Sequence, residues 1–420
     1  MRIQGYGLSD VGQERGNNED SLLIDDALGL YIVADGMGGH AHGEVASSAA
    51  VRTVARYLRE EGIASKPDLP IPELVAVAET AVQHASKRIW EMATSRQGYA
   101  GMGTTLSILL VRDTKGIMLH VGDSRLYLMR GDRIDQLSSD HTFTSELVRN
   151  GVFTPEQVRN SPYSNVLTRA LGKSETVQVD TLVFDILPGD TFLICSDGLT
   201  GYVPDDELGD YLCADDIRGL PHQLVALANE RGGHDNITAV VVRSDDGDAV
   251  SQEELLHCTR IQEQFSTLQA IHLFKGISMA GLVKLMDISR ELPLTPGQSP
   301  INEGDVCPGL LIILEGSVAV IRDGYQLATL GPGDMAGEMS CLRQTPSTAT
   351  LKALTPCRYM VIDYSELERL YSKDPTLGIN LLRNLGHTLA ERLDKTTSRL
   401  LSDRAEQEEL DELPSILFVP

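Results

Sequence analysis

The chain has 420 residues, which is too long for one ordinary domain and predicts two or three. It carries 60 Asp and Glu against 36 Lys and Arg, a net charge of −24. Nucleic acid and anionic membranes require a basic surface, so this balance excludes both as general partners. The acidic excess is compatible with cation binding, although a solvated acidic surface explains most of it.

The six cysteines are scattered and form no C-x-x-C pair. In a chain of this length, that pattern is typical of reduced thiols in the cytosol. The first residues, MRIQGYGLSD, lack the apolar centre of a signal peptide, and no apolar run approaches the ~18 residues of a membrane span. We therefore expect a cytoplasmic protein without a membrane partner.

A short buried strand is predicted at 31–33, followed by Asp35 and a glycine-rich turn. Helical periodicity predicts helices at 44–61 and 71–95, and apolar runs predict strands at 104–111, 116–121, 125–129, 191–195 and 237–242. A polar, helix-prone stretch occupies 138–160. Strands separated by long helices indicate sheets covered by helices. We expect residues 1–244 to form one such domain.

A polar, acidic stretch at 244–248 marks the boundary, and a helical connector is expected at 252–265. After a short helix at 282–290, Gly and Pro recur every few residues, as in a jelly roll or barrel. Strands at 310–314 and 318–321 flank Glu315-Gly316 and predict a hairpin. Helices follow at 365–370 and 377–401. The expected division is a domain at 1–244, a linker helix at 245–264, a second domain at 265–400 and an acidic, then apolar tail at 401–420.

Five acids of the first domain lie in turns at the edges of apolar runs: Asp20, Asp35, Asp123, Asp197 and Asp235. Strands of a common sheet could bring them to one edge. Each alone could be an ordinary turn residue, but five together indicate a site. Clustered carboxylates repel one another until protons or a cation relieve the repulsion. Oxygen ligands with few His or Cys nearby favour Mg²⁺ or Mn²⁺ over zinc.

The chemistry of such a site follows from its charge. Two cations about 4 Å apart, bridged by a carboxylate, can activate a water and hold a phosphoryl oxygen. Arg15 lies five residues before Asp20 and is a candidate bidentate phosphate ligand, with an ordinary surface arginine as the alternative.

Eight ordered motifs span nearly all of residues 1–244: SDVGQERGNNED, ADGMGGH, GMGTT, HVGDSRLY, SSDHT, LTRALG, CSDGLTG and DNITAVVV. Their order resembles that of metal-dependent protein phosphatases of the type 2C Ser/Thr class, in its bacterial branch. The resemblance implies an α-β-β-α sandwich with a dinuclear Mn/Mg centre between two sheets. The substrate would be a phosphoprotein, dephosphorylated at Ser or Thr.

The resemblance also implies roles for the acids. Asp35 would bridge both ions, and the Gly36 carbonyl would bind the first. Asp197 and Asp235 would hold the second. Asp20, with Glu19, would act largely through waters on the ions. Asp123 would hold a third, looser ion, and Arg15 would bind the substrate phosphate. Catalytic residues on this reading are Arg15, Asp35, Asp197 and Asp235.

One position departs from many eukaryotic relatives, which have His two residues after the bridging Asp as a proposed general acid. This chain has Met37 there, as bacterial relatives do, so no general acid is assigned. His40 and His42 are close in sequence, and we interpret both as structural. Residues 138–164 correspond to the mobile flap that influences substrate access.

The second domain resembles a cyclic-nucleotide-binding β-roll over about residues 265–395, through LFKGIS, GLLIILEGSVAVI and LATLGPGDMAGEMSCLRQTPSTATLKAL. Backbone N–H groups at Gly337-Glu338 could bind a phosphate. The resemblance implies that Glu338 holds a ribose hydroxyl, with Ser340, Ser347 and Thr348 as further ligand-site residues. However, the family has Arg where this chain has Ser347. Loss of that charge-assisted contact typically costs tenfold or more in affinity. Arg343, four residues earlier, could compensate for the missing arginine. Two alternatives stay open: the domain is a true cyclic-nucleotide sensor, or it is a β-roll with another ligand or none.

We therefore expect an α+β chain: an α-β-β-α sandwich followed by a mostly-β jelly roll with flanking helices. The expected function is Mn²⁺- or Mg²⁺-dependent hydrolysis of phosphoserine or phosphothreonine in proteins by metal-activated water. The β-roll would be a sensor or docking module for a cyclic nucleotide or another small ligand. The alternative is a catalytically silent phosphoprotein-binding scaffold, which would not need all five acids.

Overall fold

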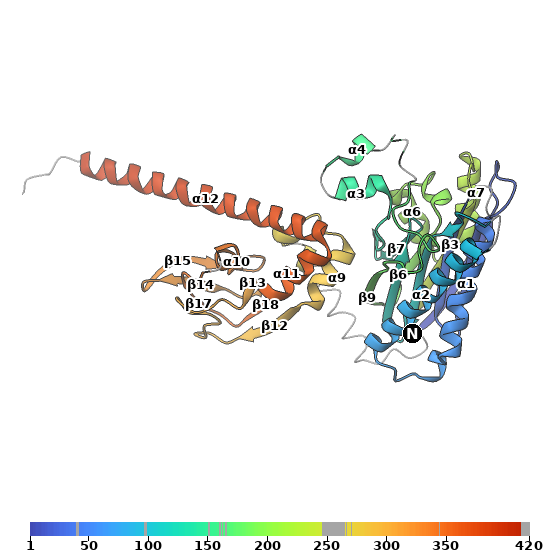
Figure 1. The fold of residues 1–420 in the computed structure, drawn as a ribbon. Helices are drawn as coiled ribbons and strands as arrows, with labels where there is room; N and C mark the ends of the chain where they lie inside the picture. Colours follow the sequence, from blue (N-terminus) through green and yellow to red (C-terminus); the bar gives the residue numbers. More distant parts are fainter. Residues whose placement is uncertain are drawn as a thin grey trace, which may run out of the picture. The chain divides into compact units, whose positions relative to one another are not determined.

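The computed structural model describes residues 1–38, 42–95, 99–149, 152–158, 161, 163, 166–245, 265, 267–269, 271–343 and 345–412. The chain divides into two compact units (Figure 1). The first comprises Met1–Gln262 and Ser278–Val283, and the second comprises Glu263–Ile277 and Lys284–Pro420. The predicted connector helix, apart from Phe265, and residues 413–420 of the predicted tail lie outside the described part.

Two antiparallel sheets form the centre of the first unit. One has the order β1-β11-β10-β7-β8 and the other the order β2-β3-β5-β6-β9, with a short strand, β4, also paired to β3. The first sheet contains β1 (Arg2–Asp10), β7 (Arg125–Arg130), β8 (Arg133–Gln136), β10 (Thr191–Cys195) and β11 (Ile237–Asp245). The second contains β2 (Asp20–Asp25), β3 (Leu30–Met37), β4 (Gly103–Thr104), β5 (Leu106–Arg112), β6 (Lys115–Val121) and β9 (Asp180–Asp185).

The two sheets pack face to face. The rings of Phe184 in β9 and Phe192 in β10 lie 5.8 Å apart across the interface. At Gly5 in β1, a Cβ atom would come within 2.5 Å of the ring of Tyr31 in β3. A larger residue would therefore force the sheets apart, since interiors are packed at near-crystal density.

Helices cover the outer faces of both sheets. Alternation along β3 explains this: Ile32 and Ala34 belong to a core shared with α1 (Gly43–Glu60) and α2 (Ile71–Ser95), whereas Tyr31 faces the other sheet. Opposite, α5 (Asp197–Thr200), α6 (Asp205–Leu212) and α7 (Leu220–Glu230) pack on the first sheet. The remaining elements are η1 (Ile63–Ser65), α3 (Phe143–Arg149) and α4 (Pro155–Val158). The predicted α-β-β-α sandwich is confirmed.

The second unit is a β-roll built from two sheets, with the orders β12-β18-β13-β16 and β15-β14-β17, around a shared core. Its strands are β12 (Ser289–Leu294), β13 (Gly309–Glu315), β14 (Val318–Arg322), β15 (Tyr325–Leu330), β16 (Met335–Ala336), β17 (Thr350–Ala353) and β18 (Cys357–Asp363). Its helices are η2 (His272–Phe274), α10 (Glu338–Arg343), α11 (Tyr364–Lys373) and α12 (Pro375–Glu412). The division between the units falls within α9 (Met279–Asp287), whose residues up to Val283 belong to the first unit. Figure 1 shows α12 extending well beyond the strands of this unit.

The hairpin predicted at Glu315-Gly316 is wrong. The strand β13 pairs with β16 and β18, whereas β14 pairs with β15 and β17, so the chain crosses from one sheet to the other at this turn. Gly316 has φ +83°, and a Cβ there would meet Pro356 O at 2.3 Å, so the turn packs directly on the start of β18. The helix predicted at 282–290 is displaced by three residues, because α9 runs from Met279 to Asp287 and β12 begins at Ser289.

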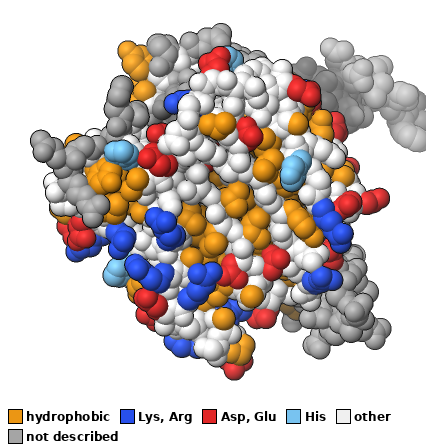
Figure 2. Space-filling view, turned by 90° about the vertical axis from the view of Figure 1, so that its right-hand side faces the viewer, with side chains coloured by type: hydrophobic (Ala, Val, Ile, Leu, Met, Phe, Trp, Pro, Cys, Tyr) orange, Lys and Arg blue, Asp and Glu red, His pale blue; other side chains and the backbone are white. Residues whose placement is uncertain are grey.

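The surface is consistent with the acidic composition. Figure 2 shows Asp and Glu side chains dispersed over one face among hydrophobic and basic ones, rather than gathered in one field. Within the described part of the chain, no helix is both long enough and apolar enough to cross a bilayer.

Candidate active site

Four aspartates from both sheets of the first unit converge on a fifth, Asp35. Asp35 lies in β3, directly opposite Asp20 at the start of β2. Asp123 follows β6, Asp197 follows β10 at the start of α5, and Asp235 precedes β11. The charges of all four raise the pKa of Asp35. The structure thus brings together the five acids that the sequence singled out.

Backbone contacts fix the position of Asp35. Its N–H donates to Thr105 Oγ1 at 2.8 Å, and its carbonyl accepts from the Thr105 N–H and from Thr104 Oγ1, both at 2.9 Å. Thr105 Oγ1 is also 2.6 Å from Ser124 Oγ, next to Asp123. These hydroxyls explain the GMGTT and GDSR motifs, whose positioning role the sequence analysis did not assign.

Gly36 permits a close approach of three chain segments. A Cβ atom at this position would lie 2.2 Å from Gly43 O and 2.5 Å from Glu19 O. Only glycine fits here. The Gly36 N–H donates to the Glu19 carbonyl at 3.1 Å, so Glu19 is held beside the acid cluster.

Asp20 is buried with one oxygen satisfied and one unsatisfied. Its Oδ2 accepts from Ser196 Oγ at 2.7 Å and from Thr238 Oγ1 at 2.6 Å. Its Oδ1 has no hydrogen-bond partner among the described residues. A buried carboxylate oxygen without a partner is costly, so this atom is available to a water or to an ion-bound ligand.

Arg15 lies against Asp235. Its Nη2 donates to Asp235 Oδ2 at 2.7 Å, and both side chains remain about half exposed. Asn236 organises the same loop, because its amide donates to the Val11 and Asn17 carbonyls and its Oδ1 accepts from the Glu19 N–H. The sequence analysis missed Asn236, although it lies inside the quoted DNITAVVV motif.

Burial and crowding raise the pKa values of four of the clustered acids, Asp20, Asp35, Asp123 and Asp197. Withdrawal from water is the largest cause for each, followed by neighbouring carboxylates for Asp35, Asp123 and Asp197. The pKa of Asp20 rises to about 7 and that of Asp123 to about 8. The pKa values of Asp35 and Asp197 also rise. Asp35, Asp123, Asp197 and Asp235 are only partly covered, so an ion from solvent can reach them.

The donor set fits a hard divalent cation. It consists of carboxylate and carbonyl oxygens, the ligands that Mg²⁺ and Mn²⁺ prefer. Within the described ranges, no three His, Cys, Asp or Glu side chains already form a group that could hold an ion. One reason is visible: both Asp235 oxygens are engaged, by Arg15 and by the Asn236 N–H. Arg15 would have to release Asp235 Oδ2 before this oxygen could hold an ion.

His141, from the SSDHT motif, fixes the loop that carries Asp123. The Gly122 N–H donates to His141 Nδ1 at 3.0 Å, and the His141 N–H donates to Gly122 O at 2.7 Å. The imidazole is fully buried, and Nε2 bonds Asp180 Oδ2 at 3.0 Å. The sequence analysis did not identify this residue as a support of the site.

Two histidines that we interpreted as structural, His40 and His42, follow Asp35 closely in the sequence. His42 has φ +62° and bonds Glu44 Oε1 at 3.1 Å, with its ring 4.8 Å from that of Tyr99. These contacts fit the structural role predicted for it. His40 lies outside the described residues.

Two of the residues predicted to bind a ligand in the second unit, Glu338 and Ser347, already bond other groups of the protein. Glu338 is buried and pairs with Arg392 of α12 at 2.9 Å, while Arg392 Nη2 also donates to Met335 O at 2.6 Å. Ser347 Oγ donates to the Ala349 carbonyl at 2.8 Å. Arg392 is 54 residues from Glu338, and no local sequence pattern signalled the pair.

The remaining residues of this predicted pocket differ in exposure. Ser340 is buried and Thr348 is exposed. Gly337 has φ +90°, and a Cβ there would lie 2.6 Å from Gly309 O.

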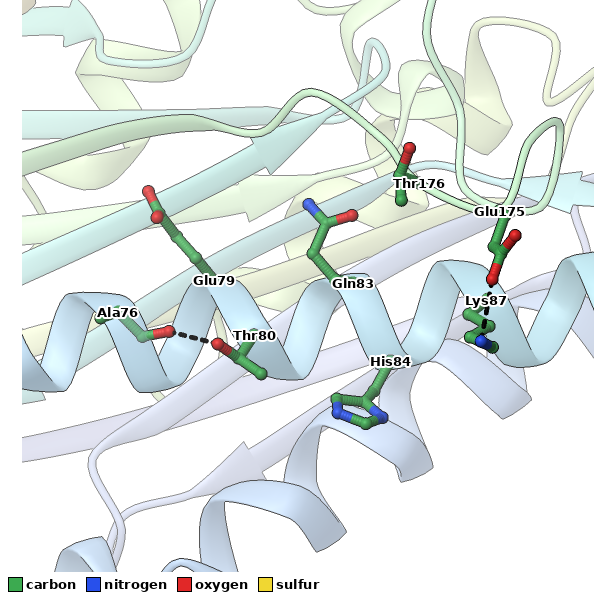
Figure 3. A pocket seen from close by; sticks show the side chains of 8 residues that line it. All are labelled: Ala76, Glu79, Thr80, Gln83, His84, Lys87, Glu175 and Thr176. Carbon is green, nitrogen blue, oxygen red and sulfur yellow. Dashed lines mark hydrogen bonds and ion pairs between the residues drawn. The ribbon is translucent and has the colours of Figure 1, made fainter.

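A hollow of about 540 Å³ lies elsewhere, between α2 and the segment that carries Glu175 and Thr176. Figure 3 shows its lining side chains on α2 and on the segment that carries Glu175 and Thr176. None of the five aspartates lines it. Lys87 and Glu175 form an ion pair of 2.8 Å at one end, which is an ordinary surface contact.

The fold and the oxygen-rich acid cluster define a class: two-sheet proteins with a site suited to hard divalent cations. Comparison with known proteins narrows it. The family profile "Protein phosphatase 2C" matches residues 13–215, and "Cyclic nucleotide-binding domain" matches residues 291–374. A Ser/Thr phosphatase, stp, from Listeria innocua is 38% identical over 240 residues, 56% of this chain and 93% of that protein.

Solved structures agree. PppA, a regulatory component of T6SS in Pseudomonas aeruginosa, is 37% identical with a TM-score of 0.51, covering 58% of this chain and 98% of that one. The catalytic domain of the Ser/Thr phosphatase PstP, in complex with two manganese ions, is 34% identical with a TM-score of 0.51, covering 58% and 99%. The chain belongs to the type 2C family of metal-dependent Ser/Thr protein phosphatases, hydrolases that use Mn²⁺ or Mg²⁺.

The raised pKa values predict how stability depends on pH. Between the ordinary value of 3.8 and about 7 to 8, folded Asp20 and Asp123 retain protons that the unfolded chain has released. Without divalent ions, stability should therefore fall as pH rises through this window. A cation removes the repulsion, so the increase in Tm on adding Mn²⁺ should be larger at pH 8 than at pH 5.

The single tryptophan, Trp90 in α2, reports selectively on the first unit, so its fluorescence during thermal unfolding is the measurement. The Asp197→Asn variant is the control and should show a smaller difference between the two pH values. An equal Mn²⁺-induced increase at both pH values would contradict the prediction.

Proposed function

We propose that the first unit hydrolyses phosphoserine and phosphothreonine in proteins at the aspartate cluster, and that the second unit is a sensor or docking module. The observation that carries the proposal is the convergence of Asp20, Asp123, Asp197 and Asp235 on Asp35, where like charges face one another and one oxygen of Asp20 has no hydrogen-bond partner among the described residues. Such a site is incomplete without cations.

Each residue has a role in this proposal. Asp35, the Gly36 carbonyl, Asp197 and Asp235 would hold two ions. Glu19 and Asp20 would orient waters, and Asp123 would hold a looser third ion. When bound, the ions polarise a water and the phosphoryl oxygens. The half-exposed Arg15 leaves Asp235 to bind the phosphate, which offers its guanidinium the same paired-oxygen geometry as the carboxylate.

Substitutions in the aspartate cluster distinguish the phosphatase from the catalytically silent scaffold. We expect Asp35→Asn and Asp197→Asn to lower Mn²⁺-dependent phosphate release from a phosphopeptide by more than about 100-fold, because even partners that only support a ligand are worth 10–100-fold. Asp132→Asn, in the exposed turn between β7 and β8, is the matched control and should keep full activity. Unchanged activity in the cluster variants, or no activity in the native chain, would favour the scaffold.

For the second unit we propose a ligand other than a cyclic nucleotide, or none, as the leading reading. Two contacts support this: Arg392 neutralises Glu338, and the Ser347 hydroxyl is bonded to its own chain. Arg343 is exposed near the end of α10 and is the residue that would have to compensate for the missing arginine.

Calorimetric titration with cAMP and cGMP tests this reading. The native chain should bind both weakly, and Ser347→Arg should tighten binding at least tenfold by restoring a charge-assisted contact. Arg343→Ala should leave the affinity for both nucleotides unchanged in the native chain and in the Ser347→Arg variant. Submicromolar binding by the native chain that Arg343→Ala abolishes would show compensation and overturn the proposal.

A further inference from the structure

Exposed hydrophobic side chains of the first unit are concentrated in one segment. Among its described residues, six large hydrophobic side chains are exposed, and all but Met1 fall between 143 and 166. They are Phe143, Val152, Phe153, Tyr163 and Val166. Single exposed apolar residues are ordinary, but a gathering of this kind marks a surface that binds something.

Three of these residues form a patch at the base of the segment. The rings of Phe143 and Tyr163 lie 6.3 Å apart in an edge-to-face arrangement. The Phe143 N–H donates to the Val166 carbonyl at 2.8 Å, and the Val166 N–H donates to the Tyr163 carbonyl at 3.2 Å. Their exposed fractions are 46%, 58% and 48%. We call Phe143, Tyr163 and Val166 the flap patch.

The base of the segment is anchored to the acid cluster. Thr142 and Leu167 form a β-bridge directly below the flap patch. The residue before Thr142 is His141, whose backbone and ring both bond Gly122, next to Asp123. The His141 carbonyl accepts from the Thr168 N–H at 2.8 Å, so both ends of the segment meet at this anchor. The flap patch therefore begins two residues from a fixed point beside the site. Figure 1 shows α3 and α4 standing outside the sheets of the first unit.

We propose that the flap patch binds an apolar side chain next to the phosphorylated residue of the substrate. This rests on the proposed phosphatase function and narrows its substrates to phosphoproteins with Leu, Ile, Val, Met or Phe near the phosphoserine or phosphothreonine. Continuity with the acid cluster indicates the occupant: Phe143 is two residues from His141, which is bonded to Gly122 beside Asp123, so the residues that flank a phosphate held at the cluster are the nearest candidates for the flap patch. The size of the flap patch agrees with this occupant. Its three side chains can contact one or two residues of a substrate, whereas a stable protein–protein interface needs about 20–30 residues on each side.

The test compares two phosphoserine peptides of equal length and charge, one with Leu and one with Gln at the two positions on each side of the phosphoserine. Phosphate release with Mn²⁺ gives kcat/KM for each peptide, and the ratio of the two values is the preference. We expect the native chain to prefer the Leu peptide at least tenfold. The Phe143→Ser/Tyr163→Ser variant should bring the ratio close to one. Because both peptides are cleaved by the same variant, a general loss of activity cancels in the ratio.

Val152→Ser is the matched control, since it removes an exposed apolar side chain from the same segment but outside the flap patch. It should keep the native preference. A native ratio near one, or an equal loss of preference in the control, would overturn the proposal while leaving the phosphatase function intact. Absence of Mn²⁺-dependent release from both peptides and from p-nitrophenyl phosphate would overturn the phosphatase function and this inference with it.

Discussion

Repulsion among carboxylates is the constraint on which the first unit depends. Asp20, Asp35, Asp123 and Asp197 are held close together at the expense of hydration, and their pKa values rise as a result. Nothing in their local sequences favours this arrangement. It persists because hydroxyl groups and paired strands fix the backbone at each acid, and the energy for that comes from the packing of the two sheets.

The supports of the site come from both sheets, which couples packing to chemistry. Asp20 in one sheet accepts hydrogen bonds from Ser196 and Thr238 in the other. His141 ties the Asp123 loop to both ends of the segment that carries the flap patch. The segment and the loop beside the acids are therefore joined through two hydrogen bonds between His141 and Gly122.

The features that depend on neighbouring residues along the chain were predicted correctly from the sequence. The two long helices were predicted within one residue at each end because their apolar periodicity is strong, and the five acids were found because each adjoins a strand. The strand β1 was missed because glycines at 5 and 7 weaken its pattern; their small size serves the contact between sheets. The wrong hairpin at Glu315 and the missed Glu338–Arg392 ion pair have the same cause. In both, the partners are far apart in the sequence, and no pattern of neighbouring residues indicates which segments will meet.

The central claim is that the aspartate cluster is a binding site for divalent cations, and counting bound Mn²⁺ tests it most directly. Electron paramagnetic resonance of free Mn²⁺, measured as the protein is titrated, gives the number of ions held per chain. The account predicts at least two ions for the native chain and fewer for Asp35→Asn. Native protein that leaves all Mn²⁺ free in solution, or an Asp35→Asn variant that binds as many ions as the native chain, would contradict it.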